Sequence, residues 1–193
     1  NSHWHISFKE QVVKLHLGCG KRYLEGYIHV DIAEFEHIDY QLPIDDLSTF
    51  KDNTVEEIYA SHVLEYFDRN DVINVLTEWK RVLKPSGVLR LAVPNFPKLV
   101  EVYQSSKDLS SILGPLYGKW DIGNQEFIYH KTVYDENSLK NVLEEVGFKN
   151  IKIWDWQEFF KEQRDFDDHS QAYYPHMQKE SGIHVSLNLQ CEK

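Results

Sequence analysis

Two glycines follow an apolar run near the start of the chain and would let a ligand approach the backbone. The run Leu15-His16-Leu17 leads directly into Gly18-Cys19-Gly20. Glycine adopts positive φ at little steric cost and has no side chain to keep a ligand away. A Gly-x-Gly pair also occurs in plain turns, and a dinucleotide fingerprint would place another glycine at position 23, where this chain has Tyr23. The pattern favours a ligand loop and weakens a dehydrogenase interpretation.

Acidic residues stand at the positions where later strands are expected to end. Asp31 closes the run 26–31, and an acid there can accept hydrogen bonds from both hydroxyls of a ribose held by the glycine loop. The alternative is a solvated strand-ending acid. Asp46, next to Leu47, could similarly meet an adenine amino group, with the neighbouring Asp45 as the other choice. These acids extend the predicted site toward a nucleoside.

Two histidines are candidates for a general base. His62 follows a predicted strand end that faces the site, and His130 ends a predicted lid-like loop over 114–131. Imidazole titrates near neutral pH, so either could take a proton from a hydroxyl or an amine. The alternative is that His62 only packs or contacts a cofactor and that His130 is solvated. His3, His5 and the scattered later histidines show no metal-ligand spacing, so we expect no metal.

The elements that position these residues alternate between strands and helices. Apolar alternation predicts strands over 12–17, 26–31, 55–60, 87–93, 149–156 and 183–189. Spacings of three and four predict helices over 71–83 and 135–146, and a short helix from Pro97 to about Ser105. Such alternation predicts a mostly parallel sheet with helices on both faces and ligands at the carboxyl ends of its strands.

Composition limits the partners and the compartment. The 193 residues fit one domain, and 21 basic against 31 acidic residues give a net charge of −10. That charge repels nucleic-acid phosphates and anionic lipids, so neither partner is expected. The chain has only Cys19 and Cys191, one of them in the glycine loop, which favours a reducing, cytoplasmic location. Neither a signal peptide nor a run of about 18 apolar residues is visible.

Four stretches together resemble the class I methyltransferases that use S-adenosylmethionine, in particular the small type-11-like group. The resemblance implies an α/β, three-layer Rossmann-like sandwich with a mostly parallel seven-stranded sheet and an antiparallel final strand. We expect a single domain over 1–193, with a cofactor-binding half over 12–95 and a lid and substrate-side half over 96–193. The stretches are 15–20 with Val30-Asp31, Asp46-Leu47 with Asp52-Asn53, 59–67, and 81–87.

The same resemblance assigns roles to residues that match the family motifs. The glycine loop would cradle the methionine part of the cofactor and Asp31 would hold its ribose. Two residues would flank the adenine, and two more would line the pocket after the fourth strand. In chain order the cofactor-binding residues are Gly18, Cys19, Gly20, Asp31, Asp46, Leu47, Ser61 and His62.

Two departures from the family pattern affect this transfer of roles. Only 11 positions separate Gly20 from Asp31, so the helix that normally joins the first two strands must be short or replaced by a loop. Tyr66 and Asn95 stand where relatives often have a histidine and an acid, so we assign no catalytic role to either.

The expected function is therefore methyl transfer from S-adenosylmethionine, with S-adenosylhomocysteine as product. The acceptor would be an O or N atom of a small or sugar-linked polar molecule, reached by in-line displacement. Two alternatives stay open: a non-catalytic cofactor-binding or scaffold protein, and a weaker one, an NAD-dependent oxidoreductase. The sequence predicts no oligomeric state.

Overall fold

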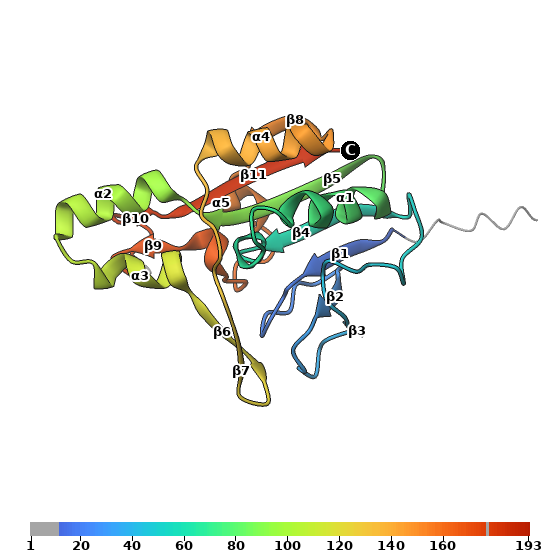
Figure 1. Cartoon of the computed structure of the whole chain (residues 1–193), viewed down its shortest axis with the longest axis horizontal. Coiled ribbons are helices and arrows are strands. Elements are labelled where there is room, and N and C mark those ends of the chain that lie inside the picture. The colour runs from blue at the N-terminus through green and yellow to red at the C-terminus, as the bar shows by residue number, and fades with distance from the viewer. Residues whose placement is uncertain (1–11, 177) are drawn as a thin grey trace, which may run out of the picture.

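A seven-stranded sheet forms the centre of the computed structural model, which describes residues 12–176 and 178–193 (Figure 1). Its strand order is β3-β2-β1-β4-β5-β11-β8. Neighbours from β3 to β5 pair in parallel, whereas β11 runs antiparallel to both β5 and β8, which confirms the expected fold. The strands are β1 (Lys14–Leu17), β2 (Ile28–Asp31), β3 (Tyr40–Gln41), β4 (Val55–Ser61), β5 (Leu83–Pro94), β8 (Lys149–Ile153) and β11 (Ser186–Glu192).

Two amphipathic helices cover one face of this sheet. Helices α1 (Val72–Val82) and α4 (Glu136–Val146) match the expected periodicity and bury their apolar side chains in the same core as Leu15 and Leu17 of β1. Asp135 begins α4, where its carboxylate accepts a hydrogen bond from the Ser138 backbone N–H at 2.7 Å. Apolar burial on this face holds the strand ends in fixed relative positions.

The opposite face is covered mainly by aromatic side chains and loops. Its helical elements are short: α5 (Trp156–Phe159) and the 3₁₀ turn η2 (His169–Gln171). Tyr59 of β4 is buried there among Trp154 and Phe160. Its hydroxyl donates to Asp168 Oδ2 at 2.6 Å, which fixes the segment before η2 against the sheet. The helical layers on the two faces are therefore unequal.

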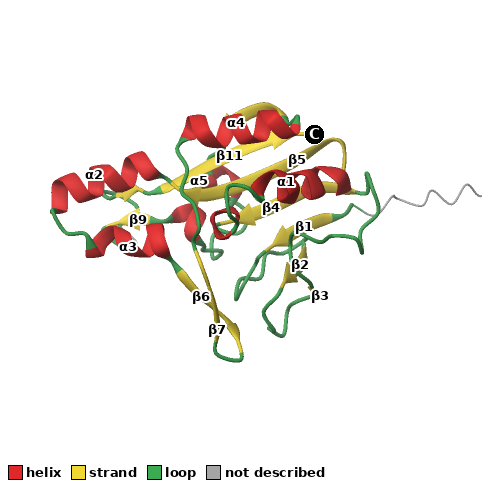
Figure 2. Ribbon diagram, in the orientation of Figure 1, coloured by secondary structure: helices red, strands yellow, loops and turns green. Residues whose placement is uncertain are grey.

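A helical pair and a short ribbon lie at one end of the sheet. Helices α2 (Phe96–Ser106) and α3 (Ser110–Tyr117) pack against the two-stranded ribbon of β9 (Tyr173–Tyr174) and β10 (Ile183–His184). The predicted short helix after β5 is thus confirmed as α2. Figure 2 shows this end of the molecule extending away from the parallel strands.

The segment 114–131 was expected to be a lid-like loop, but it contains regular secondary structure. It contains the end of α3 and then an antiparallel hairpin of β6 (Lys119–Gly123) and β7 (Glu126–Tyr129). The hairpin turn has positive φ at both Asn124 and Gln125, the backbone pattern that suits a two-residue hairpin. Figure 1 shows the hairpin projecting beside β1 and β2.

Three strand boundaries also differ from prediction. Strand β5 begins at Leu83 rather than Gly87, because Leu83 pairs with Val55 and the residues up to Gly87 bulge out before pairing resumes at Val88. Strand β8 ends at Ile153, since Asp155 caps α5. The strand expected over 183–189 is divided between β10 and β11.

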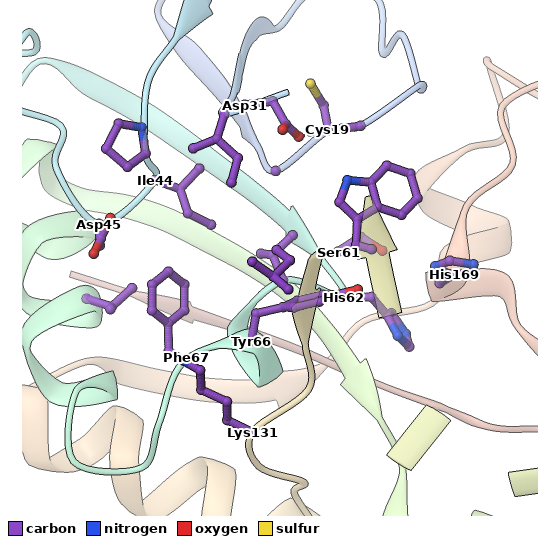
Figure 3. A pocket seen from close by; sticks show the side chains of 18 of the residues that line it. Cys19, Asp31, Ile44, Asp45, Ser61, His62, Tyr66, Phe67, Lys131 and His169 are labelled. Carbon is purple, nitrogen blue, oxygen red and sulfur yellow. Dashed lines mark hydrogen bonds between the residues drawn. The ribbon is translucent and has the colours of Figure 1, made fainter. Parts of the chain in front are cut away.

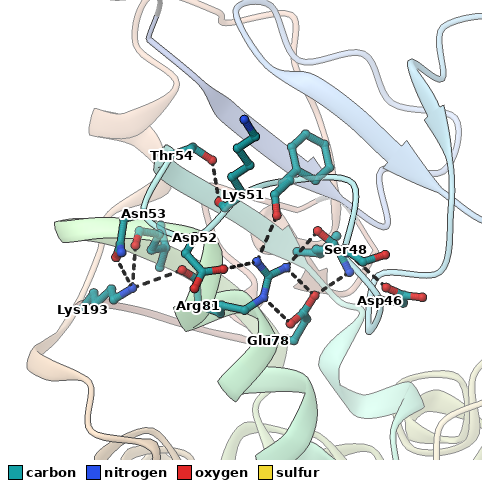
Figure 4. Close-up of polar contacts among 12 residues, drawn as sticks. Asp46, Ser48, Lys51, Asp52, Asn53, Thr54, Glu78, Arg81 and Lys193 are labelled. Carbon is teal, nitrogen blue, oxygen red and sulfur yellow. Dashed lines mark hydrogen bonds and ion pairs between the residues drawn. The ribbon is translucent and has the colours of Figure 1, made fainter.

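Arg81 on α1 ties the loop after β3 to the helix (Figure 4). Its guanidinium donates to the backbone carbonyls of Leu47 and Phe50 at 3.0 Å each and to Asp52 Oδ1 at 2.7 Å. It also donates twice to Glu78, which in turn accepts from the Leu47 N–H at 2.8 Å. Two of the stretches that resemble methyltransferases are thus in direct contact and have a structural role here.

Two general expectations concern membrane spans and cysteines. Among the residues that the structure describes, no helix combines the length and apolar character needed to cross a bilayer. Cys19 and Cys191 are both buried free thiols. The expectations about a signal peptide and about His3 and His5 fall outside the described residues.

Candidate functional site

The carboxyl ends of β1, β2 and β4 open into a cavity of about 730 Å³ (Figure 3). In this view Cys19 and Asp31 lie on one side of the cavity, and Tyr66, Phe67 and Lys131 lie on the other. The hairpin β6–β7 supplies a further wall. The lining residues are His16, Gly18, Cys19, Gly20, Arg22, Asp31, Ile32, Pro43, Ile44, Asp45, Ser61, His62, Val63, Tyr66, Phe67, Asp71, Asn74, Val75, Trp120, Phe127, Ile128, Tyr129, Lys131, Asp168 and His169.

The glycine loop has the left-handed backbone that its sequence predicts. Gly18 has φ 61° and Gly20 has φ 54°, a region that side-chain-bearing residues rarely adopt. A Cβ atom on Gly18 would lie 2.3 Å from Val63 Cγ1, so this position has no room for a side chain. The loop therefore exposes bare backbone to the cavity.

Asp31 at the end of β2 is buried and holds this loop in place. Its Oδ2 accepts from the Gly20 N–H at 2.7 Å, and its Oδ1 accepts from the Ala33 N–H at 2.8 Å. Each carboxylate oxygen keeps a further lone pair for a ligand hydroxyl. The next residue, Ile32, lines the cavity and has 37% of its surface exposed, which leaves an apolar surface beside the carboxylate.

The structure places Asp45, and neither Asp46 nor Leu47, at the cavity wall. Asp46 is exposed, and its carboxylate accepts from the Ser48 N–H at 3.1 Å. Leu47 is fully buried in the main core. Of the two acids considered at this position, Asp45 lines the cavity, with Ile44 beside it.

Cys19 and Ser61, both predicted to contact the cofactor, line the cavity. Burial, together with the negative charge of Asp31, raises the pKa of the Cys19 thiol to about 12. The thiol is therefore neutral and unreactive at neutral pH. Ser61 ends β4, next to His62 in sequence.

His62 lines the cavity but both of its ring nitrogens face protein groups. Its Nε2 lies 2.9 Å from Ser186 Oγ, and its Nδ1 lies 3.4 Å from Glu65 Oε1. Burial lowers the pKa of His62 to about 4, with His184 also lowering it and Asp168 opposing the shift. The residue has φ 54°, a strained backbone for a histidine. His62 is therefore a neutral imidazole at neutral pH.

His130 lies behind the cavity wall and does not line it. Its Nδ1 lies 2.8 Å from the Pro115 carbonyl oxygen, and its Nε2 lies 3.8 Å from Glu65 Oε1. The ring also meets Tyr66 edge to face, with 4.6 Å between centroids. The structure thus brings both predicted bases to the same carboxyl group, and only His62 of the two reaches the cavity.

Sequence reasoning missed several residues of this site. Trp120 of β6 covers the glycine loop, since a Cβ on Gly20 would lie 3.2 Å from its indole ring. Lys131 and the exposed His169 lie on the cavity wall, and Glu65 lies behind it. Trp120 lies on a strand with no fully buried residue, so burial periodicity did not mark it. No sequence signal joins His169 to His62, because η2 reaches the site only through folding.

Metal ligands show no clustering in the part of the chain that the structure describes. Within residues 12–176 and 178–193, no three His, Cys, Asp or Glu side chains converge as a metal site. The expectation of a metal-free site remains a prediction.

Comparisons with known proteins find solved methyltransferase structures with a similar fold. An Archaeoglobus fulgidus S-adenosylmethionine-dependent methyltransferase superposes with a TM-score of 0.56 at 17% identity, over 95% of this chain and 87% of that one. A Methanosarcina mazei S-adenosylmethionine-dependent methyltransferase gives 0.56 at 18% identity, over 96% and 93%. Burkholderia thailandensis 1,6-didemethyltoxoflavin-N1-methyltransferase, with that substrate and S-adenosylhomocysteine bound, gives 0.53 at 12%, over 95% and 72%. No match to a curated protein sequence was found.

The sheet order and these superpositions define the class I methyltransferase fold. Residues 15–91 match the family model described as a methyltransferase domain, and this stretch includes the glycine loop, Asp31 and His62. This match and these superpositions agree with the predicted resemblance to methyltransferases, and the similar structures named above are S-adenosylmethionine-dependent enzymes or have S-adenosylhomocysteine bound. The bare glycine loop, the carboxylate at the end of β2 and the size of the cavity fit this cofactor.

Proposed function

We propose that the protein transfers a methyl group from S-adenosylmethionine to an O or N atom of a small or sugar-linked polar acceptor by in-line displacement. The observation that supports this most directly is one cavity of about 730 Å³ with two chemically different ends. One end has the glycine loop and Asp31, and the other has titratable and aromatic side chains. A cavity of this size accepts a cofactor and a small molecule together rather than a polymer.

The cofactor end is proposed to bind S-adenosylmethionine through backbone and carboxylate groups. Gly18, Cys19 and Gly20 would contact the methionine part, and Asp31 would accept from the ribose hydroxyls. Ile32 and Ile44 offer apolar faces for the adenine ring, and Asp45 replaces Asp46 as the acid near its amino group. Leu47 contributes to the core beneath this wall.

The acceptor end is proposed to lie between β4 and the hairpin. Trp120, Tyr66 and Lys131 would orient a polar molecule there, and the hairpin would exclude water from the reacting atoms. The cofactor supplies an activated methyl carbon, so positioning is the main task of the protein. Of the two predicted bases His62 lines this end, and the exposed His169 lies beside it with 5.4 Å between ring centroids.

A transfer assay tests this proposal. The protein is incubated with methyl-labelled S-adenosylmethionine and with pools of small alcohols, sugars, amines and amino acids, and label in each product is measured. We expect label in at least one pool with the wild type and much less label with Asp31→Ala when the cofactor is kept below saturation. Binding of the cofactor without transfer to any pool would overturn the proposal and favour the non-catalytic alternative.

A further inference from the structure

Glu65 is a buried carboxyl group directly behind the cavity wall. Its side chain is fully inaccessible to solvent, and neither carboxyl oxygen has a hydrogen-bond partner. It lies on the 3₁₀ turn η1 (Leu64–Tyr66), which follows β4. A buried and unpaired carboxylate is costly, so such a group is expected either to keep a proton or to face a cation.

The hydrogen bonds around His62 define which of its ring nitrogens is protonated. Asn188 Nδ2 donates to the Ser170 carbonyl at 3.0 Å, so Asn188 Oδ1 is the acceptor for the Ser186 hydroxyl at 2.7 Å. Because the Ser186 hydroxyl donates its hydrogen bond to Asn188, its oxygen accepts a hydrogen bond from His62 Nε2 at 2.9 Å. In a neutral ring Nδ1 is then bare, and it faces Glu65 Oε1 at 3.4 Å.

His130 presents its other nitrogen to the same oxygen. The Pro115 carbonyl can only accept, so His130 Nδ1 carries the hydrogen that spans their 2.8 Å separation. The Nε2 atom of the neutral ring is therefore bare, and it lies 3.8 Å from Glu65 Oε1. Two bare nitrogens and one carboxyl oxygen thus face one another without a hydrogen bond.

The other groups around this site do not supply the missing proton in a hydrogen bond. Burial, and after it the charge of Glu65, raises the pKa values of the Tyr66 and Tyr134 hydroxyls, and the Tyr134 hydroxyl has no hydrogen-bond partner. His169 and the Glu65 backbone act on the Glu65 carboxyl, whereas Asp168, His184 and the His169 backbone act on His62. Burial raises the pKa of Glu65 to about 7, against the opposing effect of His130.

We infer that Glu65, His62 and His130 form a buried unit that holds one shared proton, with Glu65 as the positioning residue that fixes the His62 ring at the acceptor end of the cavity. The protonated Glu65 carboxyl has a single hydrogen, which it donates to one bare nitrogen at a time. The catalytic meaning of the unit rests on the proposed function, whereas the shared proton rests on the hydrogen-bond directions alone.

Histidine ring ¹⁵N and glutamate side-chain carboxyl ¹³C NMR of the full chain, without ligand, tests this inference between pH 5 and 9. In the wild type we expect His62 as the Nε2–H tautomer and His130 as the Nδ1–H tautomer. One near-neutral titration step should be visible at Glu65 and should also change the His62 ring signals. In Glu65→Gln the step should be lost while both tautomers persist, because the amide donates to the rings but does not titrate. Glu56→Gln, at a partly buried ion pair with Lys84, is the control and should leave the step unchanged.

Three results would overturn the inference. They are the opposite tautomer in either ring of the wild type, a Glu65 titration in the ordinary carboxyl range that neither ring senses, and persistence of the near-neutral step in Glu65→Gln. The tautomers are read in the wild type, so the inference stays testable if Glu65→Gln does not fold. None of these measurements uses S-adenosylmethionine or an acceptor, and their outcome is therefore independent of the transfer assay.

Discussion

The Asp31 carboxylate both binds the backbone of the glycine loop and lines the cavity. Replacing it with alanine removes both bonds to backbone N–H groups and the proposed ribose contacts. We expect Asp31→Ala to weaken S-adenosylhomocysteine binding by about 1.5–3 kcal/mol, which is tenfold or more in Kd. Calorimetric titration measures this change, and thermal unfolding checks that the variant is folded. Unchanged affinity in a folded variant would rule out the ribose role.

Glu65 should make stability depend on pH in a direction opposite to that of His62. Its folded pKa of about 7 lies above the ordinary 4.5, so the stability contributed by its proton is present below about pH 4.5 and lost as pH rises through 7. The His62 pKa, lowered from 6.5 to about 4, gives stability that is present above 6.5 and lost as pH falls through 4.

The Glu65→Gln variant separates these two effects. Relative to the wild type, its free energy of unfolding should increase with pH and reach a gain of about 3 kcal/mol above pH 7. Urea unfolding at pH 5, 6, 7 and 8 measures the difference. A difference between the two proteins that is constant over this range would contradict the raised pKa.

Residues at strand ends were the most predictable part of the site. Gly18, Asp31 and His62 lie where expected, because apolar alternation marks the ends of β1, β2 and β4 and parallel strands end at one edge. The prediction of the acid after β3 was off by one position, since Asp45 and not Asp46 lines the cavity. Strand β3 has only two residues, so no periodicity sets the register of the loop that follows it. Glu65 was not predictable, since a carboxyl in an apolar stretch gives no sign of its burial.

Arg81 stabilises an element boundary rather than the chemistry. Its bonds to the Leu47 and Phe50 carbonyls require a planar fork that lysine lacks. We expect Arg81→Ala to lower the free energy of unfolding by about 1–3 kcal/mol and Arg81→Lys to recover little of it. Denaturant unfolding measures both changes.

Lys98→Ala is the matched control for Arg81. Lys98 forms an exposed ion pair with Glu101, three residues away on α2, and such pairs contribute about 0–1 kcal/mol. An Arg81→Ala loss no larger than that of Lys98→Ala would show that the loop is held by other contacts.

Elements with clear periodicity were predicted well, and elements that depend on pairing were not. Helices α1 and α4 follow directly from their apolar spacing and, for α4, from the Asp135 cap. The β6–β7 hairpin was missed because both of its strands are largely exposed, so it has no buried face to mark it. The division of β10 from β11 depends on a partner strand at 173–174 that is distant in sequence.

At the scale of the whole molecule, both predicted halves contribute strands to one sheet. Strand β11, from the C-terminal half, pairs with β5 from the cofactor-binding half along its length. The alternation of strands and helices predicted the parallel part of this sheet, and the antiparallel position of β11 came from the resemblance to methyltransferases. The halves and the single domain remain predictions.

Cofactor choice tests the central claim most directly, because the competing protein classes differ in it. Calorimetric titrations of the purified protein with S-adenosylhomocysteine and with NAD, run in parallel, separate them. We predict micromolar binding of S-adenosylhomocysteine and no heat of binding with NAD. Binding of NAD in place of S-adenosylhomocysteine would contradict the assignment of this cavity to the methyltransferase cofactor.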